Sequence, residues 1–262
     1  MIPKIIHHSA PANRKHWHYI WSICFPTWKE HFPEPEYKHV MWDDEAIDSF
    51  IEEKFPNHVD FYHSLPHHII RLDFFRFALL YEEGGIYADM DMYCVRNFYD
   101  ELYKDVAFVE SPYIKGELEN SLMAAMPKNP HLLRIMFRCR ETFAELGVRE
   151  NITGAEGSQY VLELCGPQQI TKYLAERSKE EQKEVQRLRY PLFNPHAERA
   201  DPTRLEKYFT IHMNTGNWGK DFTEWALKNL AHTGETYEGF TKRKWASHSP
   251  VWARRFGAVF PN

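Results

Sequence analysis

The chain lacks the cysteine patterns that mark whole classes of protein. Its four cysteines, Cys24, Cys94, Cys139 and Cys165, form no CxxC pair and no spacing typical of a metal site. They predict reduced core thiols in a cytosolic protein. Positive charge is also scarce, since 32 Lys and Arg stand against 37 Asp and Glu, for a net charge of -5. A general electrostatic attraction to nucleic acid is therefore not expected.

Long hydrophobic runs are absent as well. No stretch of about 18 apolar residues occurs, so no membrane span is expected. The first residues, 1–6, lack a charged segment followed by a long apolar stretch, so we expect no signal peptide and a cytoplasmic protein. No P-loop, kinase-like motif, internal repeat or low-complexity segment is found. With 262 residues, one domain is the default. The high aromatic content, 15%, suits a large core or stacking on a ring-shaped ligand.

The first third of the chain follows an alternating pattern of strands and helices. A buried strand over 2–8, a helix over 14–24 that ends near Pro26, a strand over 36–42 and a helix capped by Asp43 predict an α/β domain with parallel pairing. The later segments are less regular. We expect strands at 106–110, 121–125 and 208–213, helices at 130–146, 158–164, 167–177 and 221–230, a turn at 153–157, and a solvated, charged helix face at 179–186.

The segment 66–83 is the most apolar helix candidate, and its apolar residues cover nearly the whole circumference. Such a helix is buried inside a domain, so its few polar residues are informative. Asp73 and Arg76 are three residues apart and share a face, which suits an ion pair or ligand contacts. Arg71 lies on a different face of the ideal helix, so a structural salt bridge is a serious alternative to a ligand contact for this residue. Gly84 and Gly85 end the helix, the first as a left-handed C-cap.

The motif Asp89-Met90-Asp91 follows directly after a short strand expected over 86–89. In extended backbone, residues i and i+2 point to the same face, so two carboxylates would converge on one spot. That arrangement suits Mg2+ or Mn2+ bound partly by phosphate oxygens. A solvated turn with two ordinary acids is the alternative, and it is the better explanation of an isolated D-x-D.

The surrounding residues favour the metal site. The series Arg71-Leu72-Asp73-Phe74-Phe75-Arg76, Gly84-Gly85 and Asp89-Met90-Asp91 resembles the DXD-containing sugar-binding region of the family-32 glycosyltransferases. That group includes capsular polysaccharide transferases and initiating mannosyltransferases, and more distantly the glucosylating clostridial toxins. Further matches follow in order along the chain: 2–7, Tyr37, 42–44, Asn120, 123–125, 130–131, 166–167, 211–212 and Trp218. Cys165 departs from the family by replacing the threonine of a T-G-P motif.

The resemblance implies a GT-A fold, that is, a Rossmann-like nucleotide-sugar-binding α/β domain with a mixed central sheet and C-terminal helical additions. We expect this domain over 1–240 and a basic, aromatic tail over 241–262. The implied activity is metal-dependent transfer of a sugar from a UDP- or GDP-linked donor to a glycan or lipid-linked acceptor, in surface polysaccharide or glycan synthesis. The family is described as retaining, a property that the residues themselves do not reveal.

The resemblance also implies roles for individual residues. Asp73, Arg76 and Asp91 are the catalytic candidates, and Asp91, Asp89 and His212 the metal candidates, with Asp91 the direct ligand. Asp89 is expected to bind ribose, or the metal through water. A purely structural His212 is equally plausible. The substrate-binding candidates are Ile6, His7, Trp42, Arg71, Tyr87, Asp89, Asn120, Gly166 and Trp218. Core filling is at least as plausible for Ile6, His7 and Trp42.

Two other functions compete with sugar transfer. One is a catalytically idle nucleotide-sugar-binding module, and the other is a metal-dependent phosphotransferase or nucleotidyltransferase.

The C-terminal tail has several possible roles, because it mixes basic with aromatic residues in Thr241-Lys242-Arg243-Lys244-Trp245 and Trp252-Ala253-Arg254-Arg255-Phe256. Such a segment suits peripheral contact with an anionic membrane surface, packing on the domain, or acceptor binding.

Overall fold

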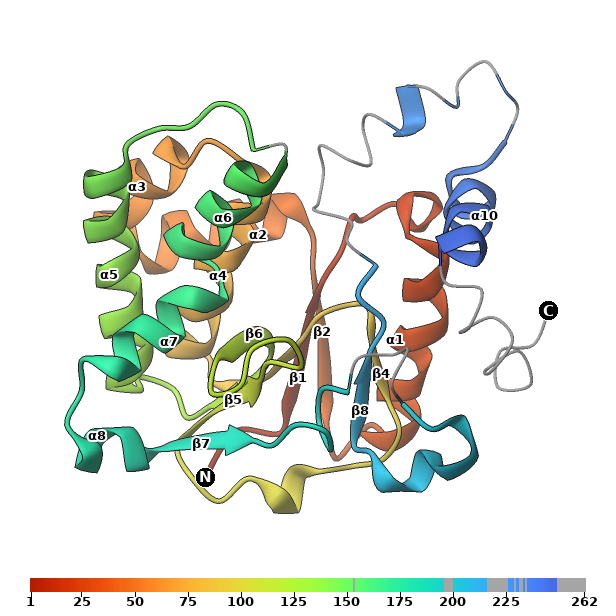
Figure 1. Cartoon of the computed structure of the whole chain (residues 1–262), viewed down its shortest axis with the longest axis horizontal. Helices are drawn as coiled ribbons and strands as arrows, with labels where there is room; N and C mark the ends of the chain where they lie inside the picture. Colours follow the sequence, from red (N-terminus) through yellow and green to blue (C-terminus); the bar gives the residue numbers. More distant parts are fainter. Residues whose placement is uncertain are drawn as a thin grey trace.

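The structure of the protein is a computed structural model. The structure describes residues 1–152, 154–195, 200–215, 226–228, 230, 233 and 235–248. A six-stranded sheet with the order β2-β1-β3-β6-β5-β7 forms its centre (Figure 1). Its strands are β1 (Ile5–Ser9), β2 (Lys38–Trp42), β3 (Gly85–Ala88), β5 (Val106–Glu110), β6 (Leu118–Ala125) and β7 (Val185–Leu188). A second, two-stranded sheet pairs β4 (Met92–Cys94) with β8 (Thr210–His212).

The central sheet is mixed. Strand β1 runs parallel to β2 and β3, and β5 runs parallel to β7, whereas β6 is antiparallel to both of its neighbours. The predicted α/β class with a mixed central sheet is therefore confirmed. Strand β3 runs parallel to β1 and ends directly before the D-x-D motif. This arrangement agrees with the GT-A fold that the resemblance implies.

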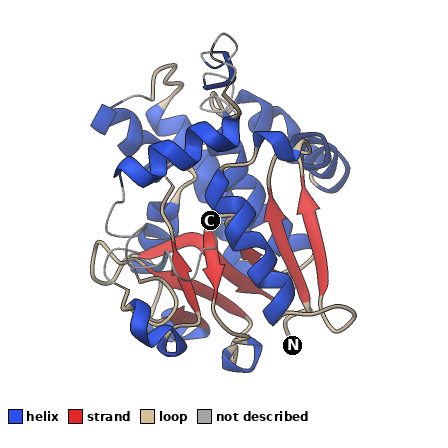
Figure 2. Cartoon of the chain, turned by 90° about the vertical axis from the view of Figure 1, so that its right-hand side faces the viewer, coloured by secondary structure: helices blue, strands red, loops and turns tan. Residues whose placement is uncertain are grey.

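Helices cover both faces of the sheet, as Figure 2 shows from the side of α1. On one face lies α1 (Tyr19–His31), and on the other lie helices of the large core cluster. These are α2 (Asp44–Lys54), α3 (Val59–Ser64), α4 (His68–Glu82), α5 (Pro130–Leu146), α6 (Gly154–Leu164) and α7 (Pro167–Ala175). Side chains alternate between the faces. Phe108 thus joins the cluster around α4, while Val109 joins the cluster around α1.

Short elements complete the described chain. They are α8 (Lys179–Glu184), α10 (Tyr237–His248), and the 3-10 turns η1 (Arg14–His16), η2 (Pro56–His58), η3 (Tyr99–Glu101) and η5 (Pro202–Lys207). Helix α10 crosses the expected boundary after residue 240 and lies beside α1, where the Tyr19 amide donates to Thr241 Oγ1 at 3.0 Å. Residues 249–262 and most of the helix expected over 221–230 lie outside the described residues.

The prediction of a single helix over 14–24 that ends near Pro26 is wrong. The chain forms η1, breaks, and restarts at α1, where the His18 ring accepts from the Ile20 amide at 3.1 Å. Helix α1 then continues through Pro26 to His31. Tertiary packing outweighs the proline here. The buried Trp28 indole, beyond the proline, donates to the Met92 carbonyl at 2.7 Å.

Two predictions in the second half also need correction. Charged residues 179–184 form an exposed helix as predicted, but the chain then enters β7, where Val185 and Gln186 are buried beside β5. The turn predicted at 153–157 is mostly helix, because α6 begins at Gly154. Gly157 lies inside it against Ile152, so closely that a Cβ atom would meet the Ile152 carbonyl carbon at 2.0 Å.

The buried His8 gives the fold a dependence on pH. Its Nδ1 lies 2.8 Å from the Ala88 carbonyl oxygen, and its ring meets the Phe25 and Trp28 rings edge-on. Burial lowers the pKa of His8 to about 3. In the unfolded chain His8 binds a proton below about pH 6.5, whereas in the folded chain it does so only below about pH 3. The His8 contribution is therefore complete above pH 6.5 and is lost as the pH falls through this window.

We expect His8→Asn to weaken this dependence, because the Asn amide keeps a donor near Ala88 but does not titrate. Between pH 8 and pH 5, the free energy of unfolding should decline by about 2 kcal/mol less in His8→Asn than in the wild type. Urea unfolding at the two pH values measures the difference. The exposed His63→Asn variant is the control and should follow the wild type. Equal declines in all three proteins would contradict the assignment to His8.

Candidate active site

Helix α4 carries a buried polar group toward one end of the central sheet. Arg76 lies between two acids, with its guanidinium 3.2 Å from Asp73 Oδ1 and 3.0 Å from Asp89 Oδ1. The predicted Asp73–Arg76 ion pair is thus present. Asn120 of β6 donates from Nδ2 to Asp73 Oδ1 at 2.9 Å. Asp73, Arg76 and Asn120 are each less than 10% exposed and pair with one another, although Arg76 Nε has no hydrogen-bond partner.

Burial and charge act in opposite directions on this group. Burial raises the pKa of Asp73 to about 7, although Arg76 and the Asn120 amide favour the carboxylate. For Arg76, burial favours the neutral form, but the carboxylates of Asp89 and Asp73 outweigh it and hold the pKa above its usual range. Arg76 is therefore a permanent cation that keeps Asp89 in place.

The D-x-D motif lies in a turn, which corrects the expectation of an extended segment. Strand β3 ends at Ala88, and the Met92 amide donates to the Asp89 carbonyl at 3.0 Å. The turn still brings the two carboxylates toward one region. Gly84, with a φ of +67°, and Gly85, with +95°, form the tight connection from α4 into β3. A Cβ atom on Gly85 would meet the Ile5 carbonyl oxygen at 2.6 Å, so only glycine fits there.

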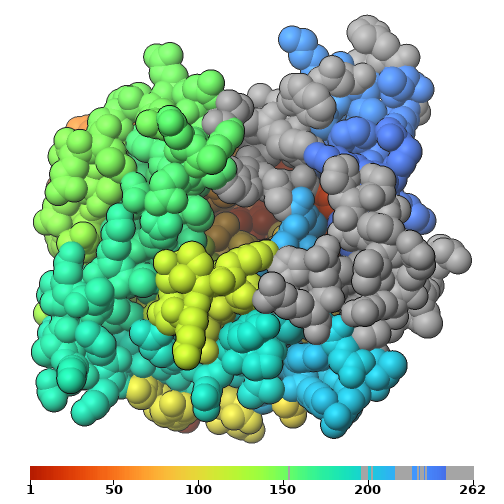
Figure 3. Space-filling model, in the orientation of Figure 1, coloured from red at the N-terminus to blue at the C-terminus, as the bar shows by residue number. Residues whose placement is uncertain are grey.

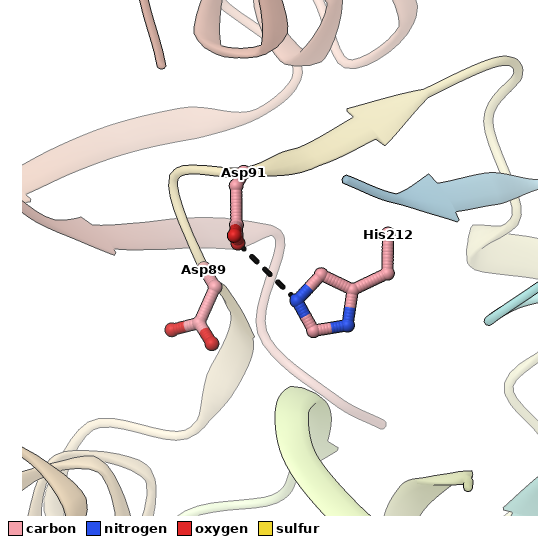
Figure 4. A group of neighbouring side chains, drawn as sticks. All are labelled: Asp89, Asp91 and His212. Atoms are coloured by element: carbon pink, nitrogen blue, oxygen red, sulfur yellow. Dashed lines mark ion pairs between the residues drawn. The ribbon is translucent and has the colours of Figure 1, made fainter. Parts of the chain in front are cut away.

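The C-terminal part of the chain fixes Asp91. Its Oδ2 accepts from both the amide and the hydroxyl of Thr215 at 2.9 Å, and its backbone carbonyl accepts from the Met213 amide at 2.9 Å. Its Oδ1 lies 3.3 Å from His212 Nε2 (Figure 4). Burial alone would raise the pKa of Asp91, but His212 and Thr215 outweigh it and hold this pKa well below its usual range. Burial lowers the His212 pKa, yet Asp91 raises it to about 9 overall.

Asp89, Asp91 and His212 form a cluster that can hold a metal ion. One ligand atom from each residue lies within 4.8 Å of the other two (Figure 4). Two carboxylate oxygens and one imidazole nitrogen suit Mn2+, since carboxylates favour hard cations and imidazole favours transition metals. Asp89 is already engaged by Arg76 and by the Tyr87 hydroxyl, which donates to its Oδ1 at 3.2 Å. Asp91 is engaged as well, by Thr215 and His212, so the direct coordination of a cation by Asp91 stays a prediction.

A bulge in β6 brings Asn120 to this place. The pairing of β5 with β6 jumps between Phe108 and Val109, so that Val109 lies opposite Glu119 while Phe108 lies opposite Met123. Within the extra segment, the Ser121 carbonyl accepts from the Asp89 amide at 2.9 Å. Bulges re-aim side chains, and this one turns Asn120 toward Asp73 and attaches β6 to the D-x-D turn.

All these groups border one cavity of about 410 Å3. Its polar lining includes four carboxylates, from Asp73, Asp89, Asp91 and Glu119, and its cations among the described lining residues are Arg76 and His212. Leu72, Val161, Leu162 and Pro167 contribute an apolar wall. In Figure 3 a hollow lies between the yellow-green segment of the β5–β6 hairpin and the green helices, with segments from the first third of the chain visible in its depth.

Several predicted substrate-binding residues lie away from this cavity. Ile6 is fully buried in the core beside α1. His7 accepts from the Trp42 indole at 3.1 Å and contacts the Gly84 carbonyl, while Trp42 packs on Phe50 and Phe75. Arg71 donates to the backbone carbonyls of His63 and Leu65. These residues stabilise the fold around the site, as the alternative of core filling foresees for Ile6, His7 and Trp42.

Three other predicted residues have different surroundings. Tyr87 is fully buried under the D-x-D turn, with the Arg76 guanidinium 5.1 Å from its ring centre, so it supports Asp89 from below. Gly166 precedes Pro167 of the cavity wall, and a Cβ atom there would meet Leu162 Cα at 2.8 Å. Trp218 lies outside the described residues.

Sequence reasoning missed further cavity residues. These are Ser9, Trp21, Ile69, Met90, Tyr113, Glu119, Ser121, Asn214 and Thr215, together with the apolar wall. Asn214 and Thr215 follow closely after His212, so the proposal of a metal ligand at His212 could have pointed to them as cavity residues. Glu119 directly precedes Asn120 and carried a similar signal. Trp21 and Tyr113 are ordinary aromatics in a chain rich in them, and no local pattern distinguishes them.

Comparisons with known proteins support the resemblance. Residues 20–109, about a third of the chain, match the family model described as the glycosyltransferase sugar-binding region containing a DXD motif. This stretch includes α4, the Asp73–Arg76 pair and the D-x-D turn. The resemblance inferred from these residues is thus confirmed.

Curated relatives give a similar result. The chain is 32% identical over 138 residues to mannosyl phosphorylinositol ceramide synthase CSH1 of Saccharomyces cerevisiae, which covers 52% of this chain and 35% of that protein. It is 33% identical over 137 residues to inositol phosphoceramide mannosyltransferase 3 of Schizosaccharomyces pombe, covering 52% and 36%. The matched part thus spans only about a third of these yeast proteins. An uncharacterised mimivirus glycosyltransferase, L373 of Acanthamoeba polyphaga mimivirus, is 27% identical, covering 61% and 62%.

Solved structures with distant similarity include two glycosyltransferases. The galactosyltransferase LgtC, solved with donor and acceptor sugar analogues, matches with a TM-score of 0.46 and 13% identity, covering 87% of this chain and 94% of that one. The PaToxG glycosyltransferase matches with a TM-score of 0.45 and 19% identity, covering 67% and 69%.

Proposed function

Because residues 20–109 carry a glycosyltransferase sugar-binding region with a DXD motif, we propose that the whole chain is a metal-dependent glycosyltransferase. It transfers a sugar from a nucleoside-diphosphate donor to a glycan or lipid-linked acceptor. One observation carries the proposal. A cluster able to hold a cation, Asp89, Asp91 and His212, borders the same cavity as the Asp73, Arg76 and Asn120 network. A cation and hydroxyl-binding groups side by side are what a sugar diphosphate requires.

The residues divide into two functional groups under this proposal. Asp91 and His212 would hold the cation directly, and Asp89 would hold it directly or through water. A bound divalent cation would neutralise the charge that develops on the leaving diphosphate. Asp73 and Asn120 present oxygen and amide groups that suit donor-sugar hydroxyls. Arg76 keeps Asp73 and Asp89 in position through its two-sided guanidinium contacts.

The relatives indicate which substrates to try first. Two of them are named for mannosyl transfer to a phosphoinositol ceramide lipid. We therefore take GDP-mannose as the first donor and a phosphoinositol lipid as the first acceptor, with UDP-sugars and glycan acceptors next. Retention of the anomeric configuration is part of the proposal, in line with the family-32 resemblance. The leaving diphosphate would then help to deprotonate the acceptor, and no separate general base is needed.

The cellular location of the protein and the boundaries of its domain are also parts of the proposal. Among the described helices, none combines the length and apolar character needed to cross a bilayer. A lipid-linked acceptor would bring the protein to a cytoplasmic membrane surface, with the basic residues of 241–262 as one point of contact. Lys242 and Arg243 of α10 are exposed, although Arg243 pairs with Glu235 at 2.8 Å. The division into 1–240 and 241–262 also stays a proposal.

A donor-hydrolysis experiment tests the central activity. Purified protein with GDP-mannose, and separately with UDP-glucose, should release free sugar and nucleoside diphosphate slowly when Mn2+ is present. EDTA should stop the release, and added Mn2+ should restore it. Release of nucleoside monophosphate and sugar 1-phosphate would instead identify a nucleotidyltransferase. Donor binding without any product, across a wider set of nucleotide sugars and with acceptors added, would identify a binding module and refute the proposal. Proton NMR of the first-formed sugar reports its anomeric configuration.

A further inference from the structure

One carboxylate of the cavity has no part in the arrangement described above. Glu119 lies on β6, half-buried, and lines the cavity beside Asn120. It is not one of the clustered cation-binding residues. Its role must therefore differ from metal binding and from the Asp73 network.

The surrounding structure holds Glu119 in one orientation. Asn194, which is fully buried, donates from Nδ2 to Glu119 Oε2 at 2.8 Å and to the Glu110 carbonyl at 3.1 Å. One carboxylate oxygen is thus fixed by an amide that is itself fixed by the backbone of β5. Such two-step support is typical of a side chain that must present its remaining lone pairs in a defined direction.

The charge of Glu119 restricts what it can face. A carboxylate repels the oxygens of a bound diphosphate, so it does not suit the phosphate part of a donor. Ionised carboxylates accept hydrogen bonds only, and in a sugar-transferring cavity the available donors are hydroxyl groups. The donor sugar already has Asp73 and Asn120 on the α4 side of the cavity. The hydroxyls that remain for Glu119 are those of the acceptor.

The same hairpin supplies an aromatic ring. Tyr113 lies in the connection between β5 and β6, lines the cavity and is 58% exposed. Figure 3 shows this hairpin segment, in yellow-green, standing at the edge of the hollow. An exposed aromatic face beside a carboxylate suits a polyhydroxylated ring, because the ring presents C–H groups to the aromatic and hydroxyls to the acid.

We propose that the β5–β6 hairpin forms the acceptor subsite, in which Glu119 accepts a hydrogen bond from a hydroxyl of a hexose or cyclitol ring and Tyr113 packs against that ring. This proposal rests on the proposed glycosyltransferase function. It assigns acceptor binding to residues that the motif-bearing first third of the chain does not contain.

The test separates acceptor binding from donor chemistry. Glu119→Gln keeps the shape of the side chain but removes its charge. The glutamine can also direct its NH2 group, rather than an oxygen, toward the hydroxyl of the acceptor. We expect the KM for glycerophosphoinositol or methyl α-mannoside to rise about 10- to 100-fold, the cost of a lost charged hydrogen bond. Mn2+-dependent hydrolysis of GDP-mannose without acceptor should stay within about twofold of wild type, since hydrogen bonds to the donor are untouched.

Further variants complete the test. Tyr113→Ala should raise the same KM, whereas Tyr113→Phe should behave as wild type because packing needs only the ring. Glu117→Gln, on the same hairpin but outside the cavity lining in the part of the chain described, is the matched control. Thermal unfolding of each variant shows whether the fold is intact.

Each outcome has one meaning. An unchanged acceptor KM in Glu119→Gln overturns the subsite. An equal loss of donor hydrolysis overturns it too, by assigning Glu119 to the donor or the cation. If the wild type hydrolyses donors but neither transfers to nor binds the two probes by NMR saturation transfer, the ring-binding role is rejected. If the wild type hydrolyses no nucleotide sugar, the proposed function fails instead, and the same NMR measurement still decides the subsite.

Discussion

Asp91→Asn should reduce Mn2+-dependent turnover of the sugar donor by about a thousandfold, which is the scale of losing a main electrostatic contact to the reacting charge. The asparagine keeps the size of the side chain and an oxygen for Thr215. It removes the charge that pairs with His212 and that a cation requires. Steady-state release of nucleoside diphosphate measures the loss, and titration with Mn2+ should show weaker metal binding in the same variant.

The surface variant Asp60→Asn is the control, because Asp60 is exposed and lies outside the cavity lining as described. It should retain wild-type turnover and Mn2+ dependence. Circular dichroism and thermal unfolding must show that Asp91→Asn is folded. Near-normal turnover in a folded Asp91→Asn protein would remove Asp91, and with it the proposed cation site, from the mechanism.

Arg76→Met should lower the free energy of unfolding by about 3–5 kcal/mol, the usual cost of leaving a buried charge without its partner. Arg76 is 7% exposed, and its guanidinium contacts Asp73 and Asp89 at 3.2 and 3.0 Å. Methionine fills similar space but leaves the buried Asp73 carboxylate and the half-buried Asp89 carboxylate without their cation. Arg76→Lys should lose less, because it keeps the charge, although a single ammonium cannot bridge both acids as the planar guanidinium does.

Arg134→Met supplies the comparison for this effect. Arg134 pairs with Glu181 at 3.0 Å, but its side chain is 49% exposed. Exposed pairs contribute about 0–1 kcal/mol, so this variant should unfold almost as the wild type does. Urea titrations of the two variants measure the contrast. If Arg76→Met lost no more stability than Arg134→Met, the buried network would not be holding this region together.

The sequence predicts well those features that local patterns determine. The apolar circumference of 66–83 identifies the buried helix, and the i,i+3 spacing of Asp73 and Arg76 predicts an ion pair that the structure contains. Asp43 caps α2 as expected, accepting from the Ala46 amide at 2.9 Å. Gly84 takes the left-handed conformation that ends α4. Each of these outcomes depends on residues within a few positions of one another.

Features that depend on distant pairing were not predictable in this way. No local pattern reveals the bulge between β5 and β6, because it concerns how two strands align. Trp28 draws α1 through Pro26 by a contact to Met92, 64 residues away. His212 entered the candidate site only through the family resemblance, since 121 positions separate it from Asp91. Ile6, His7 and Trp42 lie outside the cavity lining as described, because adjacency to strand ends does not say which face a side chain takes.

The attachment of Asp91 to the segment 212–215 also determines when the cluster of Asp89, Asp91 and His212 can form during synthesis of the chain. A ribosome releases the chain from the N-terminus, and the early elements are free to fold first. The Asp73–Arg76 pair and the D-x-D turn emerge long before Thr215, which lies 124 positions after Asp91. Until that last segment emerges, Asp91 lacks both His212 and its two hydrogen bonds. The nascent chain therefore lacks the complete cluster of Asp89, Asp91 and His212 until most of the protein has been made.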